Sequence, residues 1–163
     1  MVRKIVVVST VLMALAATPV SAAEPTREVH PGQDDVVITD QCNFSVLAHV
    51  DGREIITTYV DAAGAPVKQT QIFPDNRLTF TNMESSKSVT RMGTGATIVR
   101  AASNGGVSVQ ITGHGPFVPN PLTGEPGIWY LSGRGRATFD VDGNLTSVAI
   151  TGQLDDLCAQ LAL

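Results

Sequence analysis

The chain has few of the residues that carry catalysis or hold metals, since its 163 residues include only two cysteines and three histidines. The histidines, His30, His49 and His114, share no spacing, whereas a zinc site needs three or four ligands close together. Gly113 and Gly115 flank His114 and could expose its imidazole, but such glycines are more typical of a turn. The sequence therefore predicts no catalytic residue, no metal site and no cofactor.

Charged residues are also scarce, at 16% of the chain against 43% hydrophobic residues, which predicts a packed core rather than disorder. Residues 1–23 contain two of the 11 Lys and Arg and none of the 15 Asp and Glu, so the remaining charge is 9 − 15 = −6. Nucleic acids and anionic membranes call for a basic surface. This balance argues against both as partners.

Long apolar runs are absent except for one at the start, Ile5 to Ala17. Arg3 and Lys4 precede this run, Pro19 follows it, and small residues lead to Ala23, which is the pattern of a secretory signal peptide. The run is shorter than the roughly 20 residues of a membrane span. We therefore expect a secreted protein that begins near Ala23 or Glu24, has no membrane span, and meets any partner outside the cell or at its surface.

The two cysteines are Cys42 and Cys158, 116 positions apart. An even count in an exported chain favours one disulfide, the alternative being two buried free thiols. The bridge would enclose a single domain, residues 42–163, after a polar lead-in of residues 24–41. Pro25, Pro31 and Gly32 predict an irregular first part of this lead-in.

Within the domain, apolar residues alternate with Thr, Ser, Arg and Gln, and turn residues separate the segments. The clearest alternation is 107–112, and Asp51-Gly52 and Asp142-Gly143-Asn144 are typical of hairpins. The pattern predicts an all-β, antiparallel meander that forms a barrel or a sandwich, and the short connections favour the barrel. Leu154, Cys158 and Leu161 predict a short C-terminal helix over 154–161, and Gly133 separates two expected strands, 128–132 and 134–141.

The segment 114–127 contains four prolines, which a central strand does not accept. We expect a long exposed loop, because loops of this length tend to be functional. Its candidate recognition residues are His114, Phe117, Val118 and Leu122. The alternative is that Phe117 and Val118 only anchor the loop to the core.

Arg134 and Arg136 alternate with glycines in Gly133-Arg134-Gly135-Arg136, which suggests an anion site. The two arginines would share one strand face, with Asp140 farther along it. A solvated face with partial charge pairing is the more common outcome for such a segment, and it is the one we expect.

Three short motifs support a resemblance: Cys-Asn-Phe from Cys42, Phe139-Asp-x-Asp-Gly-Asn, and Gly152-x-Leu-Asp-Asp-Leu-Cys158. Together with the signal segment they resemble small secreted actinobacterial β-proteins of unassigned function. The resemblance implies a β-domain and assigns no functional residue. The function we expect is a non-catalytic binding or surface-interaction domain, and the alternatives are a barrel that binds a small apolar ligand and a small cyclase- or isomerase-type barrel enzyme. In the first alternative, the ligand would lie against Phe80, Trp129, Tyr130 and Phe139.

Overall fold

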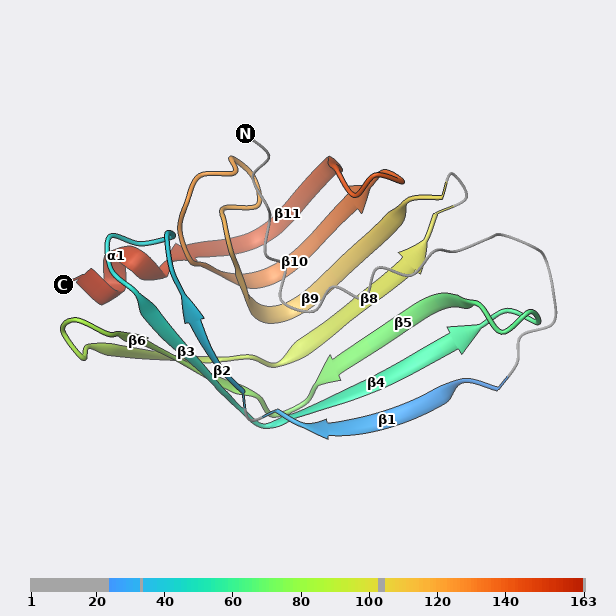
Figure 1. Ribbon diagram of the computed structural model, residues 1–163, viewed down its shortest axis with the longest axis horizontal. Helices are drawn as coiled ribbons and strands as arrows, with labels where there is room; N and C mark the ends of the chain where they lie inside the picture. The colour runs from blue at the N-terminus through green and yellow to red at the C-terminus, as the bar shows by residue number, and fades with distance from the viewer. Residues whose placement is uncertain (1–23, 33, 103–104, 163) are drawn as a thin grey trace.

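The computed structural model describes residues 24–32, 34–102 and 105–162, and the expected signal segment 1–23 lies outside these ranges. The described chain is mostly antiparallel β-structure (Figure 1), which confirms the predicted fold class. A single short helix, α1, ends it. The elements are β1 (Thr26–Pro31), β2 (Asp34–Ile38), β3 (Val46–Asp51), β4 (Arg53–Val60), β5 (Pro66–Phe73), β6 (Arg77–Asn82), β7 (Ser88–Met92), β8 (Gly95–Ala101), β9 (Val107–Phe117), β10 (Trp129–Phe139), β11 (Leu145–Asp156) and α1 (Leu157–Ala162).

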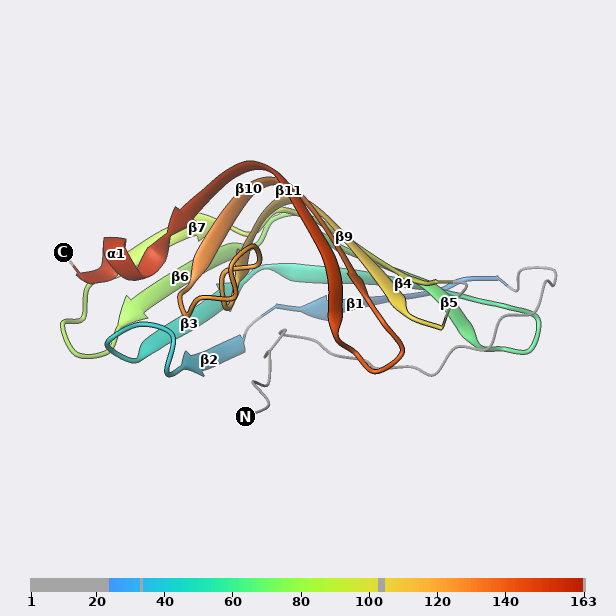
Figure 2. The same ribbon diagram turned by 90° about the horizontal axis from the view of Figure 1, so that it is seen from above.

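The strands form two sheets, and the strand order of the smaller sheet follows that of the first four strands of the larger sheet. The larger sheet has the order β1-β4-β5-β8-β9-β10-β11, and the smaller has the order β2-β3-β6-β7. Each strand of the smaller sheet is therefore the continuation, across a short bend, of a strand in the larger one. The molecule is a meander creased across its strands, with the smaller sheet and α1 at one end (Figures 1 and 2).

Two expectations about this topology were wrong. The larger sheet does not close into a barrel, because β1 and β11 are its two edges in the described chain. Asp51-Gly52 does not join a hairpin either, since β3 pairs with β2 and β6 while β4 pairs with β1 and β5. Asp142-Gly143-Asn144 does join the paired strands β10 and β11.

Asn76 organises the bend in the first half of the chain. Its buried Oδ1 accepts a hydrogen bond of 2.8 Å from the Arg53 N–H, and its carbonyl accepts one of 2.7 Å from Gly93. Gly52 has φ of +142°, and a Cβ there would lie 2.4 Å from Asn76 Oδ1. Gly52 is thus required at the bend, because only glycine permits both this φ angle and such a close contact between the backbone and Asn76.

The bend continues through β8, β9, β10 and β11 as a row of glycines. Gly95, Gly113, Gly133 and Gly152 lie directly opposite one another in the sheet register. A Cβ on any of them would lie 2.2–2.4 Å from a carbonyl oxygen of the neighbouring strand. Gly133 therefore does not separate two strands as predicted, because β10 passes through it as one bent strand.

The buried core lies at the smaller-sheet end. Val46, Leu78 and Phe80 from β3 and β6 pack with residues of β10, α1 and the preceding loop, which are Ile128, Tyr130, Leu157 and Leu161. Cys42 and Cys158 pack against this cluster and form the predicted disulfide, with their Cα atoms 5.5 Å apart.

The helix and the lead-in differ from the prediction. The Asp156 carboxylate accepts a hydrogen bond of 3.1 Å from the Ala159 N–H, so α1 starts at Leu157 and β11 extends through Leu154 to Asp156.

The lead-in is not irregular at its start, because β1 pairs along its full length with β4, and β2 pairs with β3. No helix among the described residues is long and apolar enough to span a membrane.

Candidate functional site

The structure does not bring the four candidate recognition residues together. His114 lies within β9, which continues to Phe117, so the connection to β10 is 118–128 rather than 114–127. Pro116 is accepted there because β9 beyond Gly113 pairs only with β10. Val118 packs against the core, whereas the side chain of Leu122 is 55% exposed.

His114 is part of a packed polar cluster at the crease. Its Nδ1 lies 3.2 Å from Ser132 Oγ, and its ring stacks on Tyr130 with 6.1 Å between the ring centroids. Tyr130 donates a 2.7 Å hydrogen bond to the Met92 carbonyl, and burial raises the pKa of its hydroxyl. A serine–histidine pair can activate a nucleophile only when the histidine is oriented, and no carboxylate among the described residues bonds to His114. The arrangement joins β9, β10 and β7.

A hollow of about 410 Å³ lies where β6 and β7 meet the bend, with Asn76, Arg77, Arg91 and Met92 in its wall. Its one carboxylate, Asp75, forms an ion pair of 3.0 Å with Arg53. The four aromatic residues expected around a barrel ligand do not share a cavity. Phe80 and Tyr130 are buried in the core, and Phe139 lies on the larger sheet away from it.

The larger sheet instead offers one broad apolar surface. Its register places Val99, Val109, Ala137 and Val148 in one row, and Ile111 and Ile150 in the next row of the same side. Each side chain is partly buried, and none belongs to the buried core of the described chain. We call this surface the apolar face; it consists of Val99, Val107, Val109, Ile111, Ala137, Phe139, Val148 and Ile150.

This part of the sheet extends away from the smaller sheet and α1 (Figures 1 and 2). The alternation of 107–112 predicted Val107, Val109 and Ile111 on one side of their strand. The same alternation is typical of a side that packs inside a protein, so it did not predict that these side chains lie outside the buried core. The apolar face is the feature that sequence reasoning missed.

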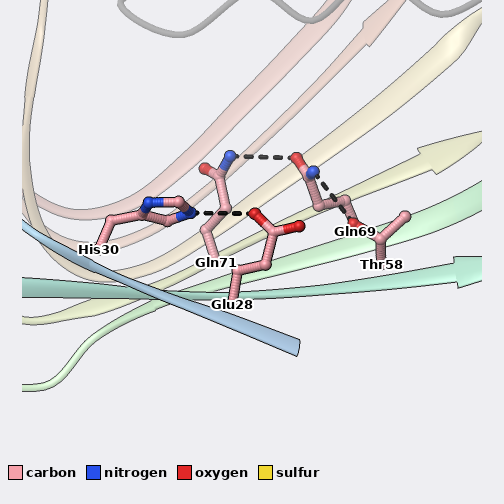
Figure 3. Close-up of polar contacts among 5 residues, drawn as sticks. All are labelled: Glu28, His30, Thr58, Gln69 and Gln71. Carbon is pink, nitrogen blue, oxygen red and sulfur yellow. Dashed lines mark hydrogen bonds and ion pairs between the residues drawn. The ribbon is translucent and has the colours of Figure 1, made fainter. Parts of the chain in front are cut away.

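On β1, β4 and β5 the same side of the sheet is mainly polar (Figure 3). Gln71 donates to Gln69 Oε1 at 3.1 Å, Gln69 donates to Thr58 Oγ1 at 3.4 Å, and His30 Nε2 lies 3.1 Å from Glu28 Oε2. Burial raises the pKa of Glu54 in the same region; His30 opposes the shift and Asp34 adds to it. We call this region the polar margin; it consists of Glu28, His30, Glu54, Thr58, Gln69 and Gln71.

Asp140 does not pair with Arg134 and Arg136 as predicted. Its carboxylate accepts hydrogen bonds from the backbone N–H groups of Asp142 and Asn144 and from the Asn144 amide, at 2.8–3.1 Å. The bond from the Asn144 side chain is the largest cause that lowers the Asp140 pKa. Asp140 therefore stabilises the β10–β11 hairpin, and the two arginines remain without it.

Within the described ranges, no group of three His, Cys, Asp or Glu residues could hold a metal ion. No known protein family, curated protein or solved structure matches the chain. Function must therefore be inferred from the two sides of the larger sheet.

Proposed function

We propose that the protein is a secreted, non-catalytic binding domain that takes an amphiphilic ligand on the apolar face. The observation that carries this proposal is the register of β8, β9, β10 and β11, which collects eight apolar side chains on one side of a sheet, outside the buried core. Contiguous apolar surfaces of this kind mark binding sites, because water contact with them is costly. The disulfide is compatible with an oxidising, extracellular location.

The dimensions and borders of the surface favour an amphiphile over a purely apolar molecule. Four adjacent strands, with about 4.8 Å between neighbours, make the apolar face roughly 14 Å wide. On its β5 side it passes directly into the polar margin, because Gln69 lies in the row of Val99 and Gln71 lies in the row that contains Ile111. An apolar chain across β8–β11 thus places a head group against the amides and carboxylates of β1, β4 and β5.

The charges of the polar margin determine which head groups are complementary to it. Glu28 and Glu54 lie in the polar margin, whereas no lysine or arginine of the larger sheet points to this side. A cationic head group, or a neutral one that donates hydrogen bonds, is complementary to these acceptors, and an anionic one is repelled. The ligand class is therefore an amphiphile with a cationic or hydrogen-bond-donating head.

Binding of the neutral apolar dye Nile red tests the site. We expect Val109→Asp to weaken dye binding at least tenfold, because it places a charge in the centre of the apolar face. Gln110→Asp is the matched control, since the neighbouring residue points to the opposite side, and it should change the affinity less than twofold. Fluorescence titration measures both variants, and both should melt within a few degrees of the wild type.

Displacement of the dye tests the head group. Decyltrimethylammonium should displace Nile red at a concentration several-fold lower than decyl sulfate, below the micellar range of either. The proposal fails if the wild type does not bind the dye, or if Val109→Asp and Gln110→Asp weaken binding equally. A large loss of stability in Val109→Asp would also contradict it, because that result requires the face to be packed.

A further inference from the structure

The side of the larger sheet opposite the apolar face collects its cations. Arg27 and Arg136 lie in one row, Lys68 and Arg100 in a second, and Arg134 in a third, and all three rows point to the same side. Nine Lys and Arg follow residue 23, and the register places six of them here. We call this side the cation face; its cations are Arg27, Arg53, Lys68, Arg100, Arg134 and Arg136.

Three arginines lie at the centre of this face. Arg100, Arg134 and Arg136 are exposed, and none forms an ion pair or hydrogen bond within the part of the chain that the structure describes. Arg53 is paired with Asp75, and Lys68 Nζ lies 4.5 Å from the centre of the Tyr59 ring. Asp140 is held in its hairpin, as described above, so it does not neutralise the arginines.

The spacing of the three arginines suits a chain of anionic groups. Arg134 and Arg136 are two residues apart on β10, or about 7 Å, and β8 with Arg100 lies two strands away, or about 10 Å. These are spacings between backbone positions, and at such intervals each long arginine side chain can bind a separate anionic group of a polymer. Hydroxyl and amide side chains point to the same side: Ser108, Gln110 and Thr112 lie between β8 and β10, and Thr138 and Ser147 lie beside Arg136.

We propose that the cation face binds an acidic polysaccharide, whose carboxylate or sulfate groups meet the arginines and whose hydroxyls meet the Ser, Thr and Gln side chains. Single-stranded nucleic acids fit less well, because their binding sites use exposed aromatic rings for base stacking. Of the two tyrosines that point to this side, Tyr59 is covered by Lys68 and Tyr130 is buried. This surface is independent of the proposed amphiphile site, which lies on the other side of the sheet.

Binding to immobilised alginate, dextran sulfate and neutral dextran tests the proposal. Wild-type protein should bind one or both acidic polymers, show no binding to dextran, and lose affinity as salt increases from 50 to 300 mM, because exposed charges are screened. Retention on alginate identifies carboxylates as sufficient, whereas retention on dextran sulfate alone identifies sulfate. Binding to neither polymer would overturn the proposal.

The variant R134Q/R136Q should weaken binding at least tenfold. The matched control is R77Q/K87Q, which removes the same charge from the region of the smaller sheet and should change affinity less than twofold. R100Q/R136Q gives a second pair across β8 and β10. Equal losses in the control and in both test pairs, or tighter binding to polyuridylate than to the acidic polysaccharides, would overturn the proposal. Nile red binding should be unchanged in R134Q/R136Q, so failure here is distinguishable from failure of the amphiphile site.

Discussion

Replacing both Cys42 and Cys158 with alanine should lower the free energy of unfolding by about 4 kcal/mol. The bridge joins residues 116 positions apart, and closing a loop of this length removes much of the conformational freedom of the unfolded chain. It also fixes α1, whose Leu157 and Leu161 complete the buried core. Urea denaturation followed by circular dichroism measures the change.

Reduction of the wild-type protein is the control for this prediction, because it breaks the bridge without removing a side chain. The reduced wild type and the double alanine variant should agree within about 1 kcal/mol. A double variant as stable as the oxidised wild type would contradict the role given to the bridge.

Replacing Gly113 with alanine should cost about 3 kcal/mol. Gly113 has φ of +104°, and a Cβ there would lie 2.4 Å from the Thr94 carbonyl oxygen and 2.7 Å from Gly95 Cα. Both partners are backbone atoms, so the strain is relieved only if β8 and β9 separate at the crease. The same urea denaturation measures the loss.

Gly115→Ala is the matched control, two residues farther along the same strand. A Cβ at Gly115 meets nothing within 4 Å, and alanine restricts the unfolded chain more than glycine does. This variant should unfold within about 1 kcal/mol of the wild type. Equal losses at Gly113 and Gly115 would show that the glycine row does not determine the crease.

Most strands were predictable from sequence, but β1, the unbroken course of β10 and the assignment of strands to sheets were not. Alternation in Val107 to Thr112 identifies a strand because side chains of a strand point to opposite sides in turn. Asp51-Gly52 has the residues of a hairpin, yet contacts with Asn76 and Gly32 make it a bend between two sheets. Those contacts are distant in sequence, so no local pattern encodes them.

The apolar face and the cation face could not be predicted either, because each is formed by the register of several strands. A net charge of −6 after residue 23 argued against nucleic acids and anionic membranes as partners. A sum over the chain does not show that six cations share one side of a sheet. The apolar residues of β9, β10 and β11 were recognised, but alternation is the same for a packed side and an open one. His114 was placed in a loop because the prolines beyond it suggested that β9 had ended.

The central claim is that the apolar face is open, and hydroxyl-radical footprinting of the mature monomer tests it most directly. Phe139 on the apolar face and Phe80 in the core give a comparison within one residue type, and Phe80 is only 1% exposed. We predict that mass spectrometry will find Phe139 oxidised at least tenfold faster than Phe80, with Ile111 and Ile150 also modified. Protection of Phe139, Ile111 and Ile150 to the level of Phe80 would show that the face is covered, and would contradict the account.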